Sequence, residues 1–573
     1  MKTKIYVTYD MAFMEPPKLS ILDYLKHINR YNLICLALRL VYSDDRFSEF
    51  RDYCAEFFCK DNQQFAEAAF NNISRHIANN KEDITWKPLR TYIVLSQSTA
   101  LELLKYAFAI DKKDYIDNVP IELQEQYLFK AILSINQTIS EWEIPDGNNA
   151  NGETSDLQLA QSFICSSLNN YERANLRPEY VAMLQIIKGY HFFRYCENSK
   201  IRPHLSIFLK NNGMDSWQRY LYNAIHLILY PLQNNKGQFP IIKLDGQRNG
   251  EQFLKSHSFK IDTYVPLEEN KDCTFFKTHP LIEKSDDEFM PISTTFCINH
   301  IYRSIYFEFK RINETLVDSP DHINSGELLR LFTTEFSEQT LFDKYIRNAL
   351  HTHRGVKLSD VDCKIGKQKG HESDFYCRDG NYILLFENKD IKIPDKVMNS
   401  KVYSELEEEI YKKLINDVGV DQLVYNIKRI DNKEFPWDNN IPNHPRVYPI
   451  LVIDDSSLCV PGLNHILNDE LQKRLQRANI RIKVFPLVVI ELDSLIAFSN
   501  YFCSSTFRFR KMLDEYYAYL TRNRIPKNIN EVMRAAFHKY LPFYIYISQE
   551  LVKSPFDNSI FDEVCGELRT MID

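Results

Sequence analysis

The fold is decided by the stretch Glu372-Ser-Asp-Phe-Tyr-Cys-Arg-Asp-Gly-Asn-Tyr-Ile-Leu-Leu-Phe-Glu-Asn-Lys389. Its Asp379-Gly380 pair is a turn signal, and the run from Tyr382 to Phe386 is apolar and rich in β-forming residues. The stretch therefore predicts a β-hairpin whose second strand ends in two charged residues.

The register of this hairpin decides which acids meet. If Arg378 pairs with Asn381 across the turn, Asp374 lies opposite Leu385. Glu387 is then the diagonal neighbour of Asp374 on the same face, with Cβ atoms about 7–8 Å apart.

The second strand is predicted to lie in the middle of a sheet. Ile383 and Leu385 share the face of Glu387 and Lys389, because side chains alternate along a strand. The opposite face carries Tyr382, Leu384 and Phe386. A strand that is apolar on both faces is a buried one, and charges at its end cost free energy unless they are paired or bound to a metal.

These residues have the chemistry of a phosphodiester hydrolase. Two carboxylates, Asp374 and Glu387, can hold Mg²⁺ or Mn²⁺ together with substrate phosphate and water. Lys389 beside them can neutralise the charge that develops on phosphorus or orient the attacking water. Acid-x-Lys patterns also occur at ordinary solvated strand ends, so the buried setting is what favours a site.

The spacing resembles a known family. An Asp followed thirteen residues later by Glu-x-Lys is similar to the motif of the PD-(D/E)XK, or restriction-endonuclease-like, nuclease superfamily, and the resemblance extends over residues 325–500. Ser373 stands where the family name has Pro. The resemblance implies that Asp374 and Glu387 ligate Mg²⁺, with the backbone carbonyl of Asn388 as a further ligand, and that Lys389 positions or deprotonates the water.

The flanking helices supply further candidates. Apolar residues at helical spacing predict a helix over Ser325–Leu350. In the superfamily the first helix brings an acid to the metal, a role that the resemblance gives to Asp343, with Glu338 and Glu335 as alternatives. An acid on a solvated helix face is the competing interpretation of Asp343.

A second helix is predicted over Gly419–Ile430, with an apolar stripe on one face and Gln422 on another. The resemblance implies that Gln422 touches the nucleic-acid backbone near the scissile phosphate. Exposed glutamines are also common on amphipathic helices.

The rest of the core follows from two more apolar runs. Arg446–Asp454 and Arg481–Glu491 predict buried strands, and the helix predicted over Leu463–Arg477 between them indicates a parallel pair. The predicted fold is an α/β C-terminal core with a mixed central sheet flanked by helices, restriction-endonuclease-like, behind a large and mainly α-helical N-terminal region.

The 573 residues divide into four predicted units: a helical domain at 1–145, a helical and mixed domain at 156–320, the nuclease-like domain at 321–500 and a helical segment at 501–573. A Gly/Asn-rich linker over 146–155 separates the first two units. Within the second unit, strands are predicted at Ser258–Tyr264, Cys273–Lys277 and Thr294–Ile298.

Composition limits the partners. The net charge of −7 excludes a globally basic nucleic-acid coat, so a polynucleotide must be held by a local positive groove or through metal ions. The lysine loop of Lys364, Lys367 and Lys369 suits phosphate contacts. Twelve scattered cysteines and the lack of a signal peptide or an 18-residue apolar run predict a soluble, reduced, cytoplasmic protein without a membrane partner.

Three functions are compatible with this sequence. The first is a metal-dependent nuclease, with DNA favoured over RNA, placed by analogy in restriction or phage defence. The second is a catalytically inactive nuclease-fold protein that binds nucleic acid or takes part in assembly. The third is a helical interaction protein whose hairpin resembles the motif by chance. The sequence leaves a partner protein or homo-oligomer open.

Overall fold

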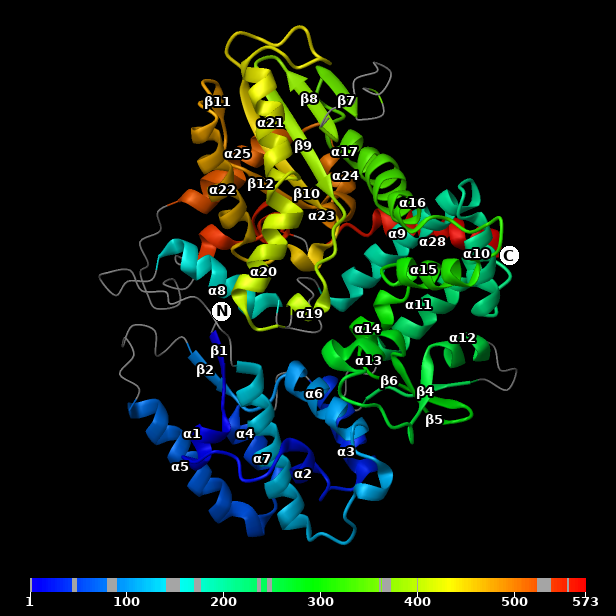
Figure 1. Ribbon diagram of the computed structural model, residues 1–573, viewed down its shortest axis with the longest axis vertical. Helices are drawn as coiled ribbons and strands as arrows, with labels where there is room; N and C mark the ends of the chain where they lie inside the picture. Colours follow the sequence, from blue (N-terminus) through cyan, green and yellow to red (C-terminus); the bar gives the residue numbers. More distant parts are fainter. Residues whose placement is uncertain are drawn as a thin grey trace.

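The protein has a mainly helical N-terminal region and a C-terminal mixed sheet covered by helices, as predicted (Figure 1). The computed structural model describes residues 3–43, 49–79, 90–140, 155–168, 177–233, 239–244, 250–359, 362, 373–398, 400–522, 537–553 and 556–572. The predicted lysine loop and nearly all of the predicted linker lie outside these residues. In Figure 1 the N-terminal helices lie at the bottom and the sheet at the top.

The N-terminal helices pack around a short parallel pair of strands, β1 (Thr3–Tyr6) and β2 (Arg90–Ile93). The helices are α1 (Tyr9–Phe13), α2 (Ile21–Leu25), α3 (Arg30–Val41), α4 (Phe50–Phe57), α5 (Gln63–Asn79), α6 (Gln97–Phe108) and α7 (Ile121–Ser140). Their apolar faces share one core, which also takes in side chains from residues 259–296. The first 140 residues are therefore joined to the middle of the chain through buried contacts.

The middle of the chain combines helices with a small sheet. Its helices are α9 (Pro178–Glu197), α10 (Arg202–Asn211), α11 (Trp217–Gln233), α12 (Glu251–Ser256), α13 (Thr274–Thr278), α14 (Thr294–Asn299) and α15 (Ile305–Thr315). The sheet has the order β3 (Ile242–Lys243), β6 (Glu288–Pro291), β5 (Leu281–Ser285), β4 (Ser258–Lys260).

Two of the strands predicted in this region are wrong. Ser258–Tyr264 does begin with β4, but Cys273–Lys277 and Thr294–Ile298 fall in the short helices α13 and α14. The Ser293 hydroxyl accepts a hydrogen bond from Phe296 N–H at 3.5 Å and starts α14, whose apolar residues are then buried. A short apolar run does not by itself distinguish a buried helix from a strand.

The C-terminal sheet has the strand order β11-β10-β9-β8-β7, with β12 also paired to β10. Its strands are β7 (Val356–Ser359), β8 (Phe375–Asp379), β9 (Tyr382–Lys389), β10 (Arg446–Ile453), β11 (Lys483–Val484) and β12 (Val488–Glu491). Strands β9, β10 and β12 are parallel, whereas β8 is antiparallel to β9. The run predicted as one strand over Arg481–Glu491 is split, with Pro486, which has no N–H to donate, in the gap.

The predicted register of the hairpin is wrong by one pair. Asp379, not Arg378, closes the hairpin by pairing with Tyr382, and Gly380 occupies the loop with φ +60°. Continuing this register places Asp374 directly opposite Glu387, closer than the predicted diagonal. The two acids remain on the same face, because the pairing shifts by an even number of residues.

Strand β9 is buried on both faces, as predicted. Ile383 and Leu385 pack into a core with α21 (Val420–Asp431) and α22 (Leu463–Arg477), while Leu384 and Phe386 pack into the core on the other side. Helix α22 has the predicted bounds. Helix α8 (Asp156–Leu168) joins the first of these cores, although it precedes the sheet by about 200 residues.

The remaining helices pack into the cores on both faces of the sheet. The predicted helix over Ser325–Leu350 consists of α16 (Ser325–Arg330), a π-helical segment η6 (Leu331–Phe342) and α17 (Asp343–Ala349). The others are α19 (Asp395–Met398), α20 (Tyr403–Ile410), η8 (Tyr411–Ile415), α23 (Leu492–Ala497), α24 (Ser499–Phe502), α25 (Phe509–Thr521), α27 (Phe543–Tyr546), η11 (Ile547–Leu551) and α28 (Ser559–Ile572).

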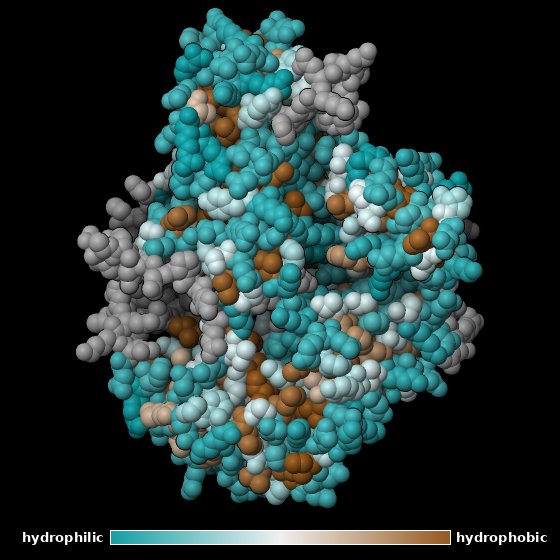
Figure 2. Space-filling view, viewed as in Figure 1, coloured by the Kyte–Doolittle hydropathy of each residue, from teal (hydrophilic) through white to brown (hydrophobic). Residues whose placement is uncertain are grey.

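The surface in Figure 2 is mostly hydrophilic, with hydrophobic residues gathered over the lower part of the view, where Figure 1 places the N-terminal helices. None of the helices in the described ranges is long and apolar enough to cross a lipid bilayer.

Candidate active site at the end of the central strand

Asp374, Glu387 and Lys389 meet at the end of β9, on one face of the sheet. The Lys389 Nζ lies 3.2 Å from Glu387 Oε2 and 3.6 Å from Asp374 Oδ2. Asp374 Oδ2 also accepts a hydrogen bond from the backbone N–H of Asn388 at 2.6 Å. The spatial arrangement that the hydrolytic interpretation requires is therefore present.

Burial sets the charge state of Glu387. Its side chain is 0 % exposed, and burial followed by the nearby charge of Asp374 raises its pKa well above the ordinary value. Burial thus favours the protonated form of this carboxyl when no cation is bound. A bound divalent ion would favour the carboxylate, because metal ligands must be deprotonated.

Lys389 remains a cation in this setting. Burial favours the neutral amine, but Asp374 and Glu387 outweigh it and raise the pKa of Lys389 above its usual value. An ammonium group cannot accept a proton from water. As a cation, Lys389 is suited to orienting the water and stabilising negative charge.

The residues present fit a divalent cation. Glu387 Oε1 is buried and has no hydrogen-bond partner, an arrangement that is costly unless another group satisfies the oxygen. Among the described residues, no third Asp, Glu, His or Cys forms a group with Asp374 and Glu387 in which all ligand atoms lie within 4.8 Å of one another. Most remaining ligands would thus be water or phosphate, as is usual for Mg²⁺.

The three upstream acids are in different environments. Asp343 accepts hydrogen bonds from Arg347 Nε at 2.7 and 2.9 Å. Glu335 is held by Arg330 at 2.7 Å and by the Tyr195 hydroxyl at 2.8 Å. Glu338 instead lies close enough to Lys389 to raise its pKa.

Gln422 has a local role at the start of α21. Its Oε1 accepts a hydrogen bond from Gly419 N–H at 3.1 Å, which closes a capping interaction around the first turn of the helix. The side chain is half-buried, so a contact with nucleic acid would have to compete with this cap.

A second charged cluster, missed from the sequence, lies at the same sheet edge. Lys188 on α9 is 3 % exposed, and its Nζ lies 2.7 Å from Asp493 Oδ1 and 3.4 Å from Asp454 Oδ1. It also donates to the Asp454 carbonyl at 3.2 Å. Asp454 N–H in turn donates to the Lys389 carbonyl at 3.2 Å, so this cluster adjoins the end of β9.

Asp390 and Asp455 extend the cluster. Burial and the charge of Asp454 raise the pKa of Asp390 to about 7. Asp455 accepts from Arg303 Nη2 at 2.6 Å, and Arg303 holds its pKa down against burial. A signal was available in the sequence: Asp390, Asp454 and Glu491 lie at or directly after the ends of three predicted apolar strands, two of which were predicted as a parallel pair. The carboxyl ends of parallel strands meet at one edge, where α/β proteins place their sites.

Glu491, the last residue of β12, has a buried side chain, and the effect of pH on protein stability tests the resulting shift of its pKa. Its side chain accepts hydrogen bonds from Ser494 Oγ at 2.9 Å and Tyr544 N–H at 3.1 Å, and burial raises its pKa from 4.5 to about 7. The folded state thus binds this proton more tightly than the unfolded chain does. Stability is lost as pH rises from about 4.5 to about 7, by an amount on the order of 3 kcal/mol.

We expect Glu491→Gln, which has the same shape but no titrating group, to remove this loss. The difference in denaturant midpoint between the variant and the parent should grow with pH across this window and level off above about pH 7. Glu314→Gln, at an exposed position, is the control. A difference that stays constant between pH 5 and 8 would contradict the assignment.

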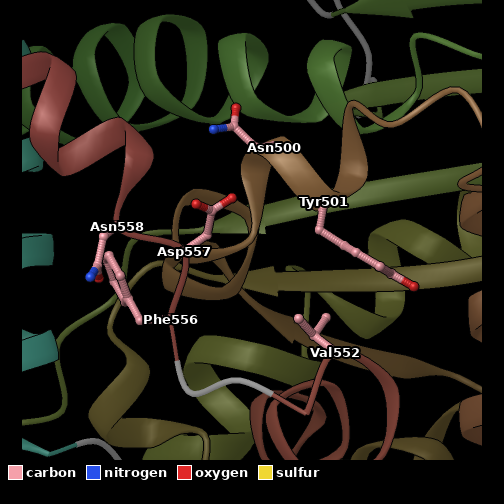
Figure 3. Close-up of a pocket in the computed structure, with 6 residues that line it drawn as sticks. All are labelled: Asn500, Tyr501, Val552, Phe556, Asp557 and Asn558. Atoms are coloured by element: carbon pink, nitrogen blue, oxygen red, sulfur yellow. The ribbon is translucent and has the colours of Figure 1, made fainter.

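A separate hollow of about 450 Å³ lies between α24 and the segment before α28 (Figure 3). It is lined by Asn500, Tyr501, Val552, Phe556, Asp557 and Asn558. Of these six side chains only Asp557 is charged, and its carboxylate accepts a hydrogen bond from Ser559 N–H at 3.2 Å. None of the lining residues belongs to the site at the end of β9.

Comparisons of the chain with protein-family models, with curated proteins and with solved structures gave no match. The functional conclusion therefore rests on the geometry of the residues themselves.

Proposed function

We propose that the protein is a metal-dependent nuclease of the PD-(D/E)XK type, which hydrolyses phosphodiester bonds with Mg²⁺ or Mn²⁺. One observation carries the proposal: Lys389 Nζ lies 3.2 Å from Glu387 Oε2 and 3.6 Å from Asp374 Oδ2 at the end of a strand buried on both faces. Buried charges are retained at such a position when they have a function or a ligand.

Each charged residue of the site has a separate proposed role in the hydrolysis. Asp374 and Glu387 would hold the cation, which when bound neutralises phosphate charge and lowers the pKa of a bound water. Glu338 would complete the acidic site in place of Asp343. Lys389 keeps the attacking water in line and stabilises the charge that develops as the water oxygen bonds to phosphorus and the bond to the leaving oxygen breaks.

The preference for DNA and for a role in restriction or phage defence comes from the resemblance alone. A direct assay separates the substrates. Purified protein is incubated with single- and double-stranded DNA and RNA in the presence of Mg²⁺, Mn²⁺ or EDTA. We expect cleavage of at least one DNA substrate with metal and none with EDTA; cleavage that EDTA leaves unchanged would contradict the proposal.

One observation favours the alternative of an inactive nuclease-fold protein that binds or assembles. Lys389 already pairs with both carboxylates, and burial raises the pKa of Glu387, so the ammonium compensates much of the acidic charge without a metal. Such a cluster can be purely structural.

Mn²⁺ titration distinguishes the two functions. We expect the parent protein to bind Mn²⁺ and Asp374→Asn to bind it at least about 10-fold more weakly, because one of its two charged ligands is lost. Asp343→Asn is the matched control, since Arg347 occupies that carboxylate. Equal binding by the parent and Asp374→Asn would favour the structural role.

A further inference from the structure

Three side chains far from β9 share a buried position between α12, α14 and α15. His257 directly follows α12, His300 directly follows α14, and Glu308 lies in the first turn of α15. The two histidines are 5 % and 4 % exposed, respectively. Their facing atoms, His257 Nε2, His300 Nδ1 and a Glu308 oxygen, all lie within 4.8 Å of one another.

In each imidazole ring, the outer nitrogen, which faces away from Glu308, already forms a hydrogen bond with a backbone carbonyl. His257 Nδ1 lies 2.8 Å from the Phe253 carbonyl oxygen, and His300 Nε2 lies 2.8 Å from that of Lys277. A carbonyl oxygen only accepts, so each of these nitrogens carries the proton. In the neutral imidazole the opposite nitrogen, which faces Glu308, then has a free lone pair.

The inner atoms do not satisfy one another. Glu308 Oε1 lies 3.9 Å from His257 Nε2 and 3.7 Å from His300 Nδ1, too far for hydrogen bonds. Neither His300 Nδ1 nor Glu308 Oε1 has any hydrogen-bond partner, although both atoms are buried. Three acceptor atoms thus converge on a shared space with no donor in it.

Such a set is the ligand set of a transition metal. Two imidazole nitrogens and one carboxylate oxygen bind Zn²⁺ at about 2.0–2.2 Å, which puts neighbouring ligand atoms about 3.4 Å apart in a tetrahedron. The two separations from Glu308 Oε1, 3.7 and 3.9 Å, are about 0.3 and 0.5 Å longer than this spacing. Imidazoles that bind metal also donate their other N–H to a carbonyl or carboxylate, as both rings do here.

We propose that His257, His300 and Glu308 bind one Zn²⁺ ion, with a water molecule as the fourth ligand. The ion would tie together three helices of the middle region. It would also fix the start of α15, next to Arg303, whose guanidinium holds Asp455 at the end of β10. The proposal does not depend on the nuclease function, since it shares none of the nuclease ligands.

The competing explanation is an ionic cluster in which a histidine is protonated and pairs with Glu308. It would require a proton on Nε2 of His257 or Nδ1 of His300 while the outer nitrogen keeps its own. The distances of 3.7 and 3.9 Å from Glu308 Oε1 are too long for the charge-assisted hydrogen bonds that such a pair would form. In an ionic cluster, Zn²⁺ binding would have to release that proton.

The test uses full-length protein carrying Glu387→Gln, so that the site at β9 does not contribute. After EDTA treatment and removal of the chelator, the protein is titrated with Zn²⁺ in competition with a chromophoric chelator. We expect about one Zn²⁺ per chain with a submicromolar Kd and a rise in Tm on binding. His257→Gln, His300→Asn and Glu308→Gln should each weaken binding at least about 10-fold.

His322→Ala, at an exposed histidine, should leave Zn²⁺ binding unchanged. X-ray absorption at the zinc edge of the Glu387→Gln protein requires no further variant and should report two imidazole ligands. The proposal is overturned if this protein takes up no Zn²⁺ at micromolar concentration, if the absorption spectrum lacks imidazole, or if all three ligand variants bind as well as their parent.

Discussion

A Glu387→Gln protein should fold like the parent and cleave nucleic acid about 10²–10³-fold more slowly. Glutamine has nearly the same shape as glutamate, so the packing around the 0 % exposed side chain is kept. The substitution removes the negative charge with which Glu387 would bind the metal ion. The measurement is the single-turnover cleavage rate with saturating Mg²⁺, set beside the thermal midpoint.

Lys389→Ala should lower the rate by a similar factor, and the exposed Lys396→Ala should not change it. Comparing the two variants separates the loss of the Lys389 ammonium group in the site from the loss of one positive charge anywhere on the protein. A Glu387→Gln protein that cleaves at the parental rate would exclude the site at the end of β9 from the chemistry. Loss of cleavage with a collapsed thermal midpoint would instead indicate a role in folding.

Lys188→Met should have the largest effect on stability, a loss of about 3–5 kcal/mol. The ammonium group compensates two buried carboxylates, Asp454 and Asp493, and methionine fills the volume without the charge. Leaving a buried charge unpaired costs more than the pair contributes. Equilibrium urea unfolding at pH 7 measures the change.

A triple variant, Lys188→Met with Asp454→Asn and Asp493→Asn, should recover most of the loss, because no uncompensated charge remains. Lys200→Met is the matched control: its ammonium is 71 % exposed and pairs with Glu327 at 3.2 Å, so the expected change is within about 1 kcal/mol. If Lys188→Met is as stable as Lys200→Met, the pairing at this sheet edge contributes little.

Local pattern was sufficient to predict the core of the C-terminal fold. The apolar runs of β9 and β10 and the periodicity of α21 and α22 indicated the elements correctly, because each is buried and regular over several residues. Register was harder to predict. Asp379-Gly380 signals a turn, but whether Arg378 or Asp379 closes it depends on which residues occupy the loop, and here Gly380 takes the positive φ.

The candidate site was only partly predictable for a different reason. Asp374, Glu387 and Lys389 belong to one hairpin, so alternation along the strands was enough to bring them together. Lys188 is a residue of α9 that reaches Asp454 across 266 positions, and His257, His300 and Glu308 come from three separate helices. No local periodicity reports contacts of that range.

The placement of Lys188 also bears on how the chain can be divided. Asp454 follows β10, and Asp493 lies in the first turn of α23. Both acids have their counter-ion, Lys188, on a helix that precedes the sheet. One apolar core also includes side chains from residue 182 to residue 568. A fragment beginning near residue 321 would therefore leave these carboxylates without their counter-ion and expose apolar side chains of the core to water. We therefore expect that the C-terminal sheet region needs the preceding helices of the chain in order to fold stably.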